Sequence, residues 1–231
     1  MRIFLVALAT IMLPAVVRAT DISVKPYISE KISYTRVGIR DSKLTLGDPS
    51  YVDPGTNEHD WVLGSKTAIG IIFPDMNSGS MRLEFEFGIN DDVKTISQNT
   101  TSTQGAMAIK MQLKTYYINT YYDIKTSTDF TPYVGFGVGI ANISGRSIAV
   151  DMPSNYAIYG KLNTNSFTYN IGFGVGYNVN NIFTVDVGYR YTNVNKMEDG
   201  LVYKEPTNIS TVTEEGHVSS HEIMVGARYN F

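Results

Sequence analysis

The chain has 231 residues, 43% of them hydrophobic, with 20 glycines, 16 tyrosines and no cysteine. One domain of ordinary size fits this length, and the absence of cysteine excludes a small fold held together by disulfides. The chain carries 19 basic and 22 acidic residues. It therefore lacks the positive charge of a nucleic-acid-binding protein, and we expect no nucleic-acid partner.

The N-terminal segment has the composition of a secretory signal peptide. Arg2 precedes the apolar run IFLVALATIMLPAVV, which is followed closely by the small residue Ala19. A short basic start, an apolar centre and a small residue at the cleavage point are the parts of such a peptide. We therefore predict a signal peptide at residues 1–19 and export of a mature domain at residues 20–231.

An uncleaved membrane anchor is the alternative for this segment. A membrane-spanning helix needs about 20 apolar residues, whereas Pro14 and Arg18 interrupt this run. Cleavage is therefore favoured. It would remove Arg2 and Arg18, leaving 17 basic against 22 acidic residues and a net charge of −5.

Apolar residues alternate with polar or small residues in eight segments of the mature domain, with the period of two that is typical of β-strands. Met81–Ile89 is the clearest example, because its odd-numbered residues are all apolar and Arg82, Glu84 and Glu86 fall on the opposite face. In chain order, the predicted strands lie at 28–34, 66–73, 81–89, 107–114, 134–140, 167–177, 183–191 and 221–231.

The connections between these segments fall into two classes of length. Short connections lie at about 74–80, 123–129 and 178–181, and long ones at about 40–60, 90–105, 142–165 and 192–217. Because short and long connections alternate, we expect tight turns at one end of the molecule and four long loops at the other.

Two all-β architectures fit eight alternating strands. A soluble sandwich or lipocalin-like barrel buries its apolar face, whereas an outer-membrane barrel turns its apolar face to lipid and fills its interior with polar groups. The polar faces here mix glycine with charges of both signs, and a closed barrel leaves no unpaired strand edge in lipid. Aromatic residues lie near the strand ends, among them Tyr34, Phe73, Tyr177, Tyr191 and Tyr229. We therefore predict an all-β, eight-stranded, antiparallel up-and-down transmembrane β-barrel.

Four segments, KPYISEKISYTR, YYINTYYDI, TPYVGFGVGIANI and the terminal GARYNF, resemble the outer-membrane β-barrel superfamily. This superfamily includes the opacity-type surface proteins and the OmpA and OmpX barrels, and the resemblance covers essentially the whole mature chain. It implies a location in the outer membrane of a Gram-negative cell and contact with outer-membrane lipid and lipopolysaccharide. In this superfamily the barrel-assembly machinery reads a C-terminal aromatic residue preceded by alternating apolar residues, which implies that role for Val225, Tyr229 and Phe231.

Glu30 departs from the pattern of the first predicted strand. Alternation places it on the face of Ile28 and Ile32, which would contact lipid. Either Glu30 lies at the rim of the membrane or the predicted register slips by one residue there.

Seven basic and four acidic side chains would point into the barrel on the predicted register. An interior of eight strands is just wide enough for side chains, and single buried charges are costly, so we expect these groups to form ion pairs. A packed polar plug is the favoured interpretation, and a narrow gated ion pore of the porin type is the alternative. The predicted luminal charges are Lys31, Lys66, Arg82, Glu84, Glu86, Lys110, Lys114, Asp186, Arg190, Glu222 and Arg228.

An enzymatic site has one weak candidate. His217 and Ser219 are two residues apart, which faintly resembles the His-x-Ser motif of lipid A deacylase barrels and would place both side chains on one face of a strand. They lie near the last predicted loop, and no carboxylate can be assigned by spacing to orient the imidazole. We therefore expect no catalytic site, cofactor or metal, with a lipid-modifying enzyme as the remote alternative, and interpret His59 as a solvated side chain.

The predicted loops are the expected recognition sites, because a rigid scaffold commonly displays binding residues on loops. The first and fourth loops each carry two basic and five acidic residues, unlike the basic loops of a heparin or nucleic-acid binder. Tyrosine and tryptophan supply large contact areas, so Tyr51, Trp61, Tyr156 and Tyr159 are the candidate contacts. We expect a non-enzymatic surface antigen that supports the envelope and acts as an adhesin, with host surface proteins as candidate partners.

Overall fold

The computed structural model describes residues 24–46, 52–54, 58–76, 78–98, 105–151, 156–204 and 209–231. The predicted signal peptide and its cleavage point after Ala19 lie outside these residues. No helix in the described ranges is long and apolar enough to cross a membrane. The strands are β1 (Lys25–Leu46), β2 (Val52–Pro54), β3 (Glu58–Met76), β4 (Gly79–Asn90), β5 (Val93–Gln98), β6 (Gly105–Ile124), β7 (Phe130–Asp151), β8 (Tyr156–Asn178), β9 (Phe183–Lys204) and β10 (Ile209–Asn230).

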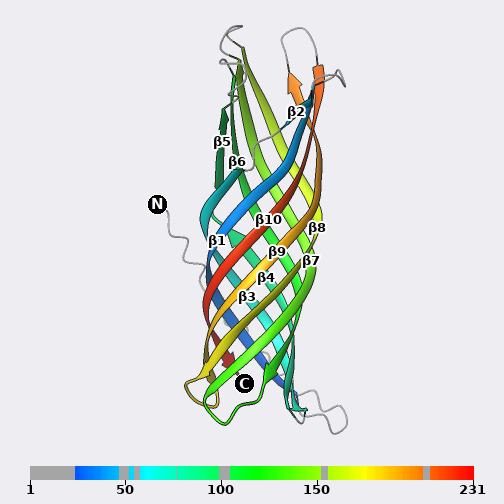
Figure 1. Cartoon of the computed structure of the whole chain (residues 1–231). Coiled ribbons are helices and arrows are strands. Elements are labelled where there is room, and N and C mark those ends of the chain that lie inside the picture. The colour runs from blue at the N-terminus through cyan, green and yellow to red at the C-terminus, as the bar shows by residue number, and fades with distance from the viewer. Residues whose placement is uncertain are drawn as a thin grey trace.

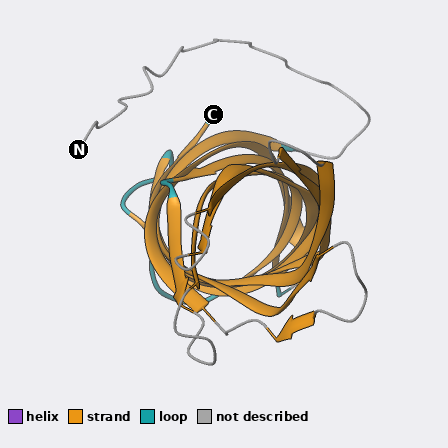
Figure 2. Ribbon diagram, turned by 90° about the horizontal axis from the view of Figure 1, so that it is seen from above, coloured by secondary structure: helices purple, strands orange, loops and turns teal. Residues whose placement is uncertain are grey.

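The strands close into a barrel. The sheet order is β10, β9, β8, β7, β6, β4, β3, β1, and β10 also pairs with β1. β5 pairs with β6 beyond the end of β4, so β4 and β5 together form one line of the wall, and the short β2 pairs with the end of β1. Figure 1 shows the slanted strands from the side, and Figure 2 shows the ring along its axis. The predicted eight-stranded antiparallel barrel is confirmed.

The two ends of the described chain meet where β1 and β10 close the ring. Tyr27 lies opposite Asn230 in the antiparallel pairing, and the backbone N–H of Phe231 donates to the carbonyl oxygen of Pro26 at 2.9 Å. The last residue is therefore bonded to the first strand. No unpaired strand edge is left at this seam, which satisfies the main requirement for backbone in lipid.

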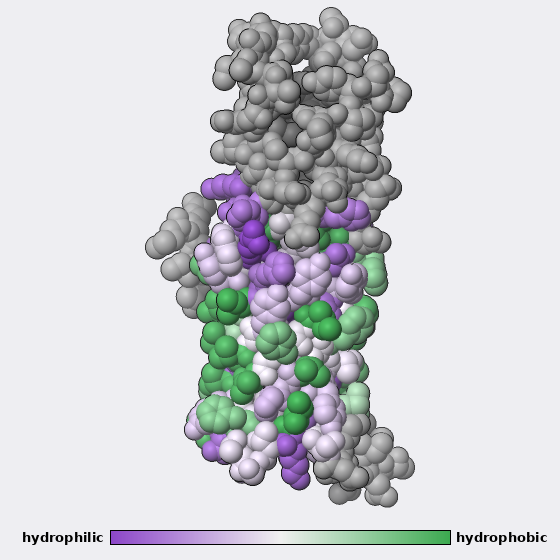
Figure 3. Space-filling view, in the orientation of Figure 1, coloured by the Kyte–Doolittle hydropathy of each residue, from purple (hydrophilic) through white to green (hydrophobic). Residues whose placement is uncertain are grey.

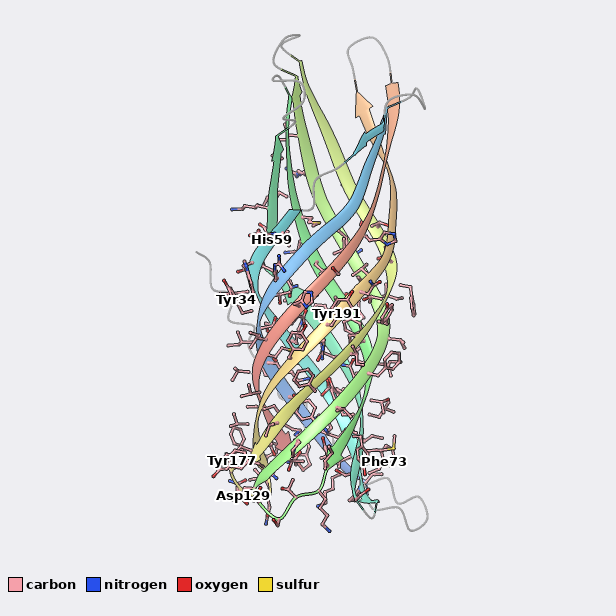
Figure 4. The ribbon with its side chains drawn as sticks, in the orientation of Figure 1. Tyr34, His59, Phe73, Asp129, Tyr177 and Tyr191 are labelled. Atoms are coloured by element: carbon pink, nitrogen blue, oxygen red, sulfur yellow. The ribbon has the colours of Figure 1, made fainter. Side chains whose placement is uncertain are left out.

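The lower part of the wall in Figure 1 has an apolar outer surface, which we call the apolar belt. Residues 130–140 of β7 and 167–177 of β8 present exposed aromatic or aliphatic side chains at nearly every second position. Segments of this length match the roughly 9–11 residues that a tilted strand needs to cross a bilayer. Figure 3 shows the hydrophobic residues gathered at this level. In Figure 4, Phe73 and Tyr177 lie near the lower edge of the belt and Tyr34 and Tyr191 near its upper edge, as in the aromatic girdles of outer-membrane barrels.

Tight turns join the strands at the lower end, as predicted. In the turn between β8 and β9, Asn180 Oδ1 accepts hydrogen bonds from the backbone N–H groups of Ile182 and Phe183 at 2.9 and 2.8 Å. Outer-membrane barrels have their short turns on the periplasmic side. The upper end is therefore the extracellular end.

The prediction of long loops at the upper end was wrong for most of the residues concerned. Residues 142–165, expected to be a loop, are largely β7 and β8, which remain paired from Phe130 and Tyr177 up to Asp151 and Tyr156. β1, β9 and β10 likewise extend beyond the belt. Most of the strands are about twice the length needed to cross the membrane, so a tube of paired strands continues into the extracellular space.

The alternation of apolar and polar faces reverses above the belt. In the extracellular half, apolar side chains fill the interior and polar side chains face water, as in a soluble barrel. The buried apolar cluster consists of Val37, Val62, Val93, Met111, Leu113, Ala141, Ile143, Val194 and Val218. The prediction that Lys110 and Lys114 point inward was wrong. Lys110 is exposed and Lys114 half-buried on the outer face, because Met111 and Leu113 occupy the interior.

Candidate functional site in the barrel interior

Ten charged side chains are buried inside the barrel among the described residues, below the apolar cluster. Nine were predicted, and Asp123 joins them in place of Lys110 and Lys114. The buried cations and anions are equal in number, so their formal charges cancel. They are Lys31, Lys66, Arg82, Arg190 and Arg228 with Glu84, Glu86, Asp123, Asp186 and Glu222.

Glu86 and Glu84, on the inner face of β4, organise the upper part of this network. Glu86 Oε1 and Oε2 accept two hydrogen bonds from Arg190 at 2.5 and 3.0 Å, the bidentate geometry that gives the strongest charge-assisted bonds. The Lys31 ammonium lies 3.0 Å from Glu86 Oε2 and 2.9 Å from Glu84 Oε1. One lysine therefore bridges the two carboxylates.

Neutral donors saturate the remaining capacity of Glu84. The Tyr27 hydroxyl donates to Oε2 at 3.0 Å, and Tyr121 and Asn119 donate to Oε1 at 3.3 Å each. A buried carboxylate with this many hydrogen-bond donors is held in one position. Glu84 is thus a structural anchor that joins β1, β4 and β6.

A second ion pair connects the network to the closing strands. Lys66 Nζ on β3 lies 3.3 Å from Glu222 Oε1 on β10, and Arg190 Nη1 lies 3.9 Å from Glu222 Oε2. The contact between Lys66 and Glu222 passes over β1, which lies between β3 and β10, whereas Arg190 and Glu222 are cross-strand neighbours on β9 and β10. The seam of the barrel is therefore braced from inside.

The lower part of the network is more loosely bonded. Arg82 Nε and Nη2 lie 3.0 and 2.8 Å from Asp123 Oδ1, whereas Arg228 lies 3.6 Å from Asp186 and 3.8 Å from Asp123. The latter are ion-pair distances, beyond the usual length of a hydrogen bond. The Arg82 guanidinium also lies over the rings of Tyr121 and Tyr133, 4.5 and 4.9 Å from their centroids.

Glycines on β7 and β8 make room for these interior rings. A Cβ atom added at Gly174 would lie 2.5 Å from Tyr133 Cζ and 2.5 Å from the Val187 carbonyl oxygen, and one at Gly135 would overlap the Tyr121 ring. Such distances do not occur between real side chains. In GFGVG the glycines therefore make room for rings inside the barrel, and the apolar residues between them face lipid outside it.

Asp123 was missed because it was placed in a turn. In the structure it is buried near the end of β6, on the inner face shared by Tyr117, Asn119 and Tyr121. Extending the period of two from Tyr117 to the end of this strand would have found it. The predicted luminal residues had more basic than acidic members, and this surplus indicated that an acidic partner was missing from the set.

A small cavity lies beside these charges. It has a volume of about 20 Å³ and is lined by Lys31, Arg82, Tyr121, Tyr133, Asp186 and Arg190, among others. A water molecule needs roughly 10–15 Å³ measured in this way. The apolar cluster lies above this level, so charged and apolar side chains occupy successive levels of the described interior.

Glu30 lies on the outer face, and the predicted register does not slip. It faces Thr67 across the pairing of β1 with β3. Its carboxylate accepts hydrogen bonds from Ser65 Oγ at 2.6 Å and Thr67 Oγ1 at 2.5 Å. Local hydroxyl groups therefore solvate this outward-facing charge.

The histidines form no catalytic arrangement in the described part of the chain. His217 is exposed while Ser219 is largely buried, and no hydrogen bond between these two side chains occurs among the described contacts. His59 is exposed on β3, on the outer wall in Figure 4. The described residues contain no cluster of His, Cys, Asp or Glu suited to a metal ion.

Trp61, predicted to be a loop contact, belongs to β3 instead. Its ring stacks on Tyr34 with centroids 4.7 Å apart and planes inclined by 17°, on the outer surface at the upper edge of the apolar belt. This pair forms part of the aromatic girdle. Tyr51 lies outside the described residues, and Tyr156 and Tyr159 lie in β8, at positions whose side chains are not described.

The predicted assembly signal lies on the outer face of β10. Val225, Tyr229 and Phe231 are exposed, and the rings of Tyr229 and Phe231 meet edge to face with centroids 5.2 Å apart. The outward direction of these side chains is the geometry expected of residues that face lipid or another protein. Their recognition during assembly stays a prediction.

Comparisons with known proteins agree with this architecture. The family model described as outer membrane protein beta-barrel domain matches residues 4–231. The outer membrane protein PagN of Salmonella typhimurium is 27% identical over 185 residues, which cover 74% of this chain and 73% of PagN.

Two solved structures show the same kind of fold. Neisserial surface protein A (NspA) aligns with a TM-score of 0.52 and 17% identity, over 90% of this chain and 99% of NspA. The outer membrane protease OmpT of Escherichia coli aligns with a TM-score of 0.53 and 12% identity, over 90% of this chain and 96% of OmpT. At these identities the likeness concerns the fold alone.

Proposed function

Because the chain belongs to the outer membrane protein beta-barrel domain family, we propose that this outer-membrane barrel is a non-enzymatic surface protein that supports the envelope and mediates adhesion. The observation that carries the proposal is the length of its strands. β7 and β8 remain paired far above the apolar belt, up to Asp151 and Tyr156. Such a tube holds the hairpin ends away from the membrane, where another cell can be reached.

The interior supports a structural role for the barrel. The buried charges are engaged with one another, and catalysis requires a nucleophile or base that can reach a substrate. The apolar cluster further disfavours passage of ions. The pore and enzyme alternatives therefore receive no specific support from the geometry.

Adhesion is tested by shortening the extracellular hairpins without disturbing the belt. Ser147 pairs with Gly160, and Leu201 with Val212, so a two-residue Asn-Gly turn can replace residues 148–159 or 202–211 at a register that the strands already use. The full-length protein and both variants are expressed at equal surface levels, and binding of the bacteria to cultured host cells is counted.

We expect at least one shortened variant to lose most of the binding. Heat-modifiable migration on gels serves as the control that the barrel still folds, and a two-residue Asn-Gly replacement of the periplasmic turn 126–128 serves as the control for loop change as such. If both folded extracellular variants bind host cells as well as the full-length protein does, the proposal that these hairpins mediate adhesion is wrong.

A further inference from the structure

Four basic residues lie side by side on the outer wall above the apolar belt. In the antiparallel pairing Lys94 of β5 is directly opposite Lys110 of β6, Lys110 is opposite Arg146 of β7, and Arg146 is opposite Lys161 of β8. All four are exposed. Adjacent strands are about 4.8 Å apart, so the basic row (Lys94, Lys110, Arg146 and Lys161) is a continuous stripe of positive charge.

The basic row is poorly neutralised by the protein itself. Asp92 lies 2.8 Å from Lys110. Asp60 Oδ2 accepts a hydrogen bond from the backbone N–H of Lys94 at 2.9 Å. Among the described contacts, no ion pair joins a carboxylate to the side-chain cation of Lys94, Arg146 or Lys161. Like charges directly opposite one another destabilise a sheet, so the row is unfavourable unless an external anion offsets it.

The row borders a groove with further hydrogen-bonding groups. An open cleft of about 380 Å³ is lined by Lys110, Arg146, Lys161, Gln112, Ser144 and Asn163, together with Asp92 and Gly145. Arginine and lysine beside hydroxyl and amide groups are the usual ligands of phosphate. The chemistry of the cleft is therefore that of a phosphate or sulfate site.

The height of the row indicates where that anion is held. At the top of the apolar belt the exposed apolar residues are Tyr116 on β6, Ile140 on β7 and Phe167 on β8, and each member of the row on these strands lies six positions further up (116 to 110, 140 to 146, 167 to 161). One further apolar residue of β7, Ile148, is exposed above the row. For strands tilted by about 40°, six residues rise roughly 15 Å. Lys114, two positions above Tyr116, lies on the same outer face close to the belt.

We propose that the basic row binds the phosphate groups of lipopolysaccharide in the surrounding outer leaflet. The cleft opens sideways from the wall, at the level of the sugar-phosphate layer and below the hairpin ends, which is where a lipid-anchored anion meets it. Binding would offset the repulsion within the row and fasten the projecting tube to its lipid surroundings. This inference does not depend on adhesion.

The test uses the full mature barrel folded in a non-ionic detergent, titrated with fluorescently labelled lipopolysaccharide. The variant Arg146→Gln/Lys161→Gln removes two members of the row and keeps the Asp92–Lys110 ion pair. The matched control is Lys25→Gln/Lys125→Gln, which removes two exposed basic residues at the periplasmic end. At about 1 kcal/mol for each basic residue at an anionic lipid surface, we expect the row variant to bind about thirtyfold more weakly and the control to bind as the wild type does.

Two further arms identify the group that is bound. Dephosphorylated lipopolysaccharide should bind the wild type as weakly as intact lipopolysaccharide binds the row variant, and the exchange Arg146→Lys/Lys161→Arg should restore most of the affinity. Equal binding by wild type and row variant, or equal affinity for intact and dephosphorylated lipopolysaccharide, would overturn the proposal. Complete displacement by millimolar inorganic phosphate would assign the row to a soluble anion and overturn the lipid source.

Discussion

Arg190 and Glu86 bond to each other across the full width of the barrel, through Nη1–Oε1 at 2.5 Å and Nη2–Oε2 at 3.0 Å. Arg190 lies on β9 and Glu86 on β4, and three lines of strand separate them in either direction around the ring. Strand number and pairing set the diameter of a barrel, and a contact between opposite walls adds a brace that resists flattening of the tube.

Replacing Arg190 by methionine should therefore be strongly destabilising. The substitution leaves Glu86 with Lys31 as its remaining cation, and breaking a buried ion pair from one side typically costs about 3–5 kcal/mol. Unfolding by urea in phospholipid vesicles measures the loss. The double variant Glu86→Leu/Arg190→Met is the control, since it removes both charges together and should lose clearly less than Arg190→Met alone. Equal losses in the single and double variants would contradict the assigned role of the pair.

Arg228 should contribute less than Arg190. Its guanidinium is 3.6 and 3.8 Å from the nearest carboxylates, so it gains ion-pair attraction without close hydrogen bonds. We expect Arg228→Met to cost less than half of the free energy of unfolding lost in Arg190→Met, measured in the same vesicles. A larger loss of unfolding free energy for Arg228→Met would show that the lower cluster contributes more to stability than the bond between Arg190 and Glu86.

Gly174 should be intolerant of alanine, because the added Cβ would lie 2.5 Å from Tyr133 Cζ and from the rigid Val187 carbonyl oxygen. Overpacking of this kind costs about 1–3 kcal/mol. Gly176→Ala, on the same strand, is the matched control, since its Cβ would lie 3.0 Å or more from the ends of the Asp186, Thr184 and Arg228 side chains. The heat-modification temperature on gels should fall for Gly174→Ala and change little for Gly176→Ala. The reverse order would refute the packing argument.

The sequence predicted the membrane-spanning half of the barrel well, because lipid imposes one simple rule on it. Apolar side chains at every second position of 167–177 specify both the strand and its outer face, and Glu30 kept its predicted register despite its charge. The pairing of opposite charges inside also followed from the cost of burying them singly.

The extracellular half was harder to predict because its surroundings change along a single strand. On β6, Tyr116 and Ile118 face lipid, whereas Met111 and Leu113 of the same strand fill the interior. A local pattern of apolar residues does not show which of the two faces is the outer one. Within the belt lipid favours apolar residues outside, whereas above it water favours apolar residues inside. For this reason Lys110 and Lys114 were predicted on the wrong face. The basic row was not recognised, because finding residues that are neighbours across strands requires the register of the strand pairing.

The barrel should not conduct ions, given the paired charges and the apolar cluster above them. In planar bilayers we expect the folded protein to show no steps of current across the voltage range that opens porins. Replacing Met111 and Leu113 by glycine should leave this unchanged, because the ion pairs below remain. Steady unitary currents from the wild type, altered in size by Arg82→Glu or Glu84→Lys, would instead support the pore alternative.

Phe231 should matter more for assembly than for the finished barrel. Its side chain is 62% exposed, and its main bond to the wall is the backbone N–H donated to Pro26 at 2.9 Å, so deleting it should lower the free energy of unfolding by only about 1 kcal/mol. If the assembly machinery reads the terminal aromatic ring, the deletion should still reduce surface levels several-fold in cells, while Phe231→Tyr keeps the ring and restores them. Quantitative immunoblots of outer membranes measure this, and refolding in vesicles gives the stability without the machinery. Normal surface levels of the truncated chain would mean that the ring serves the lipid interface alone.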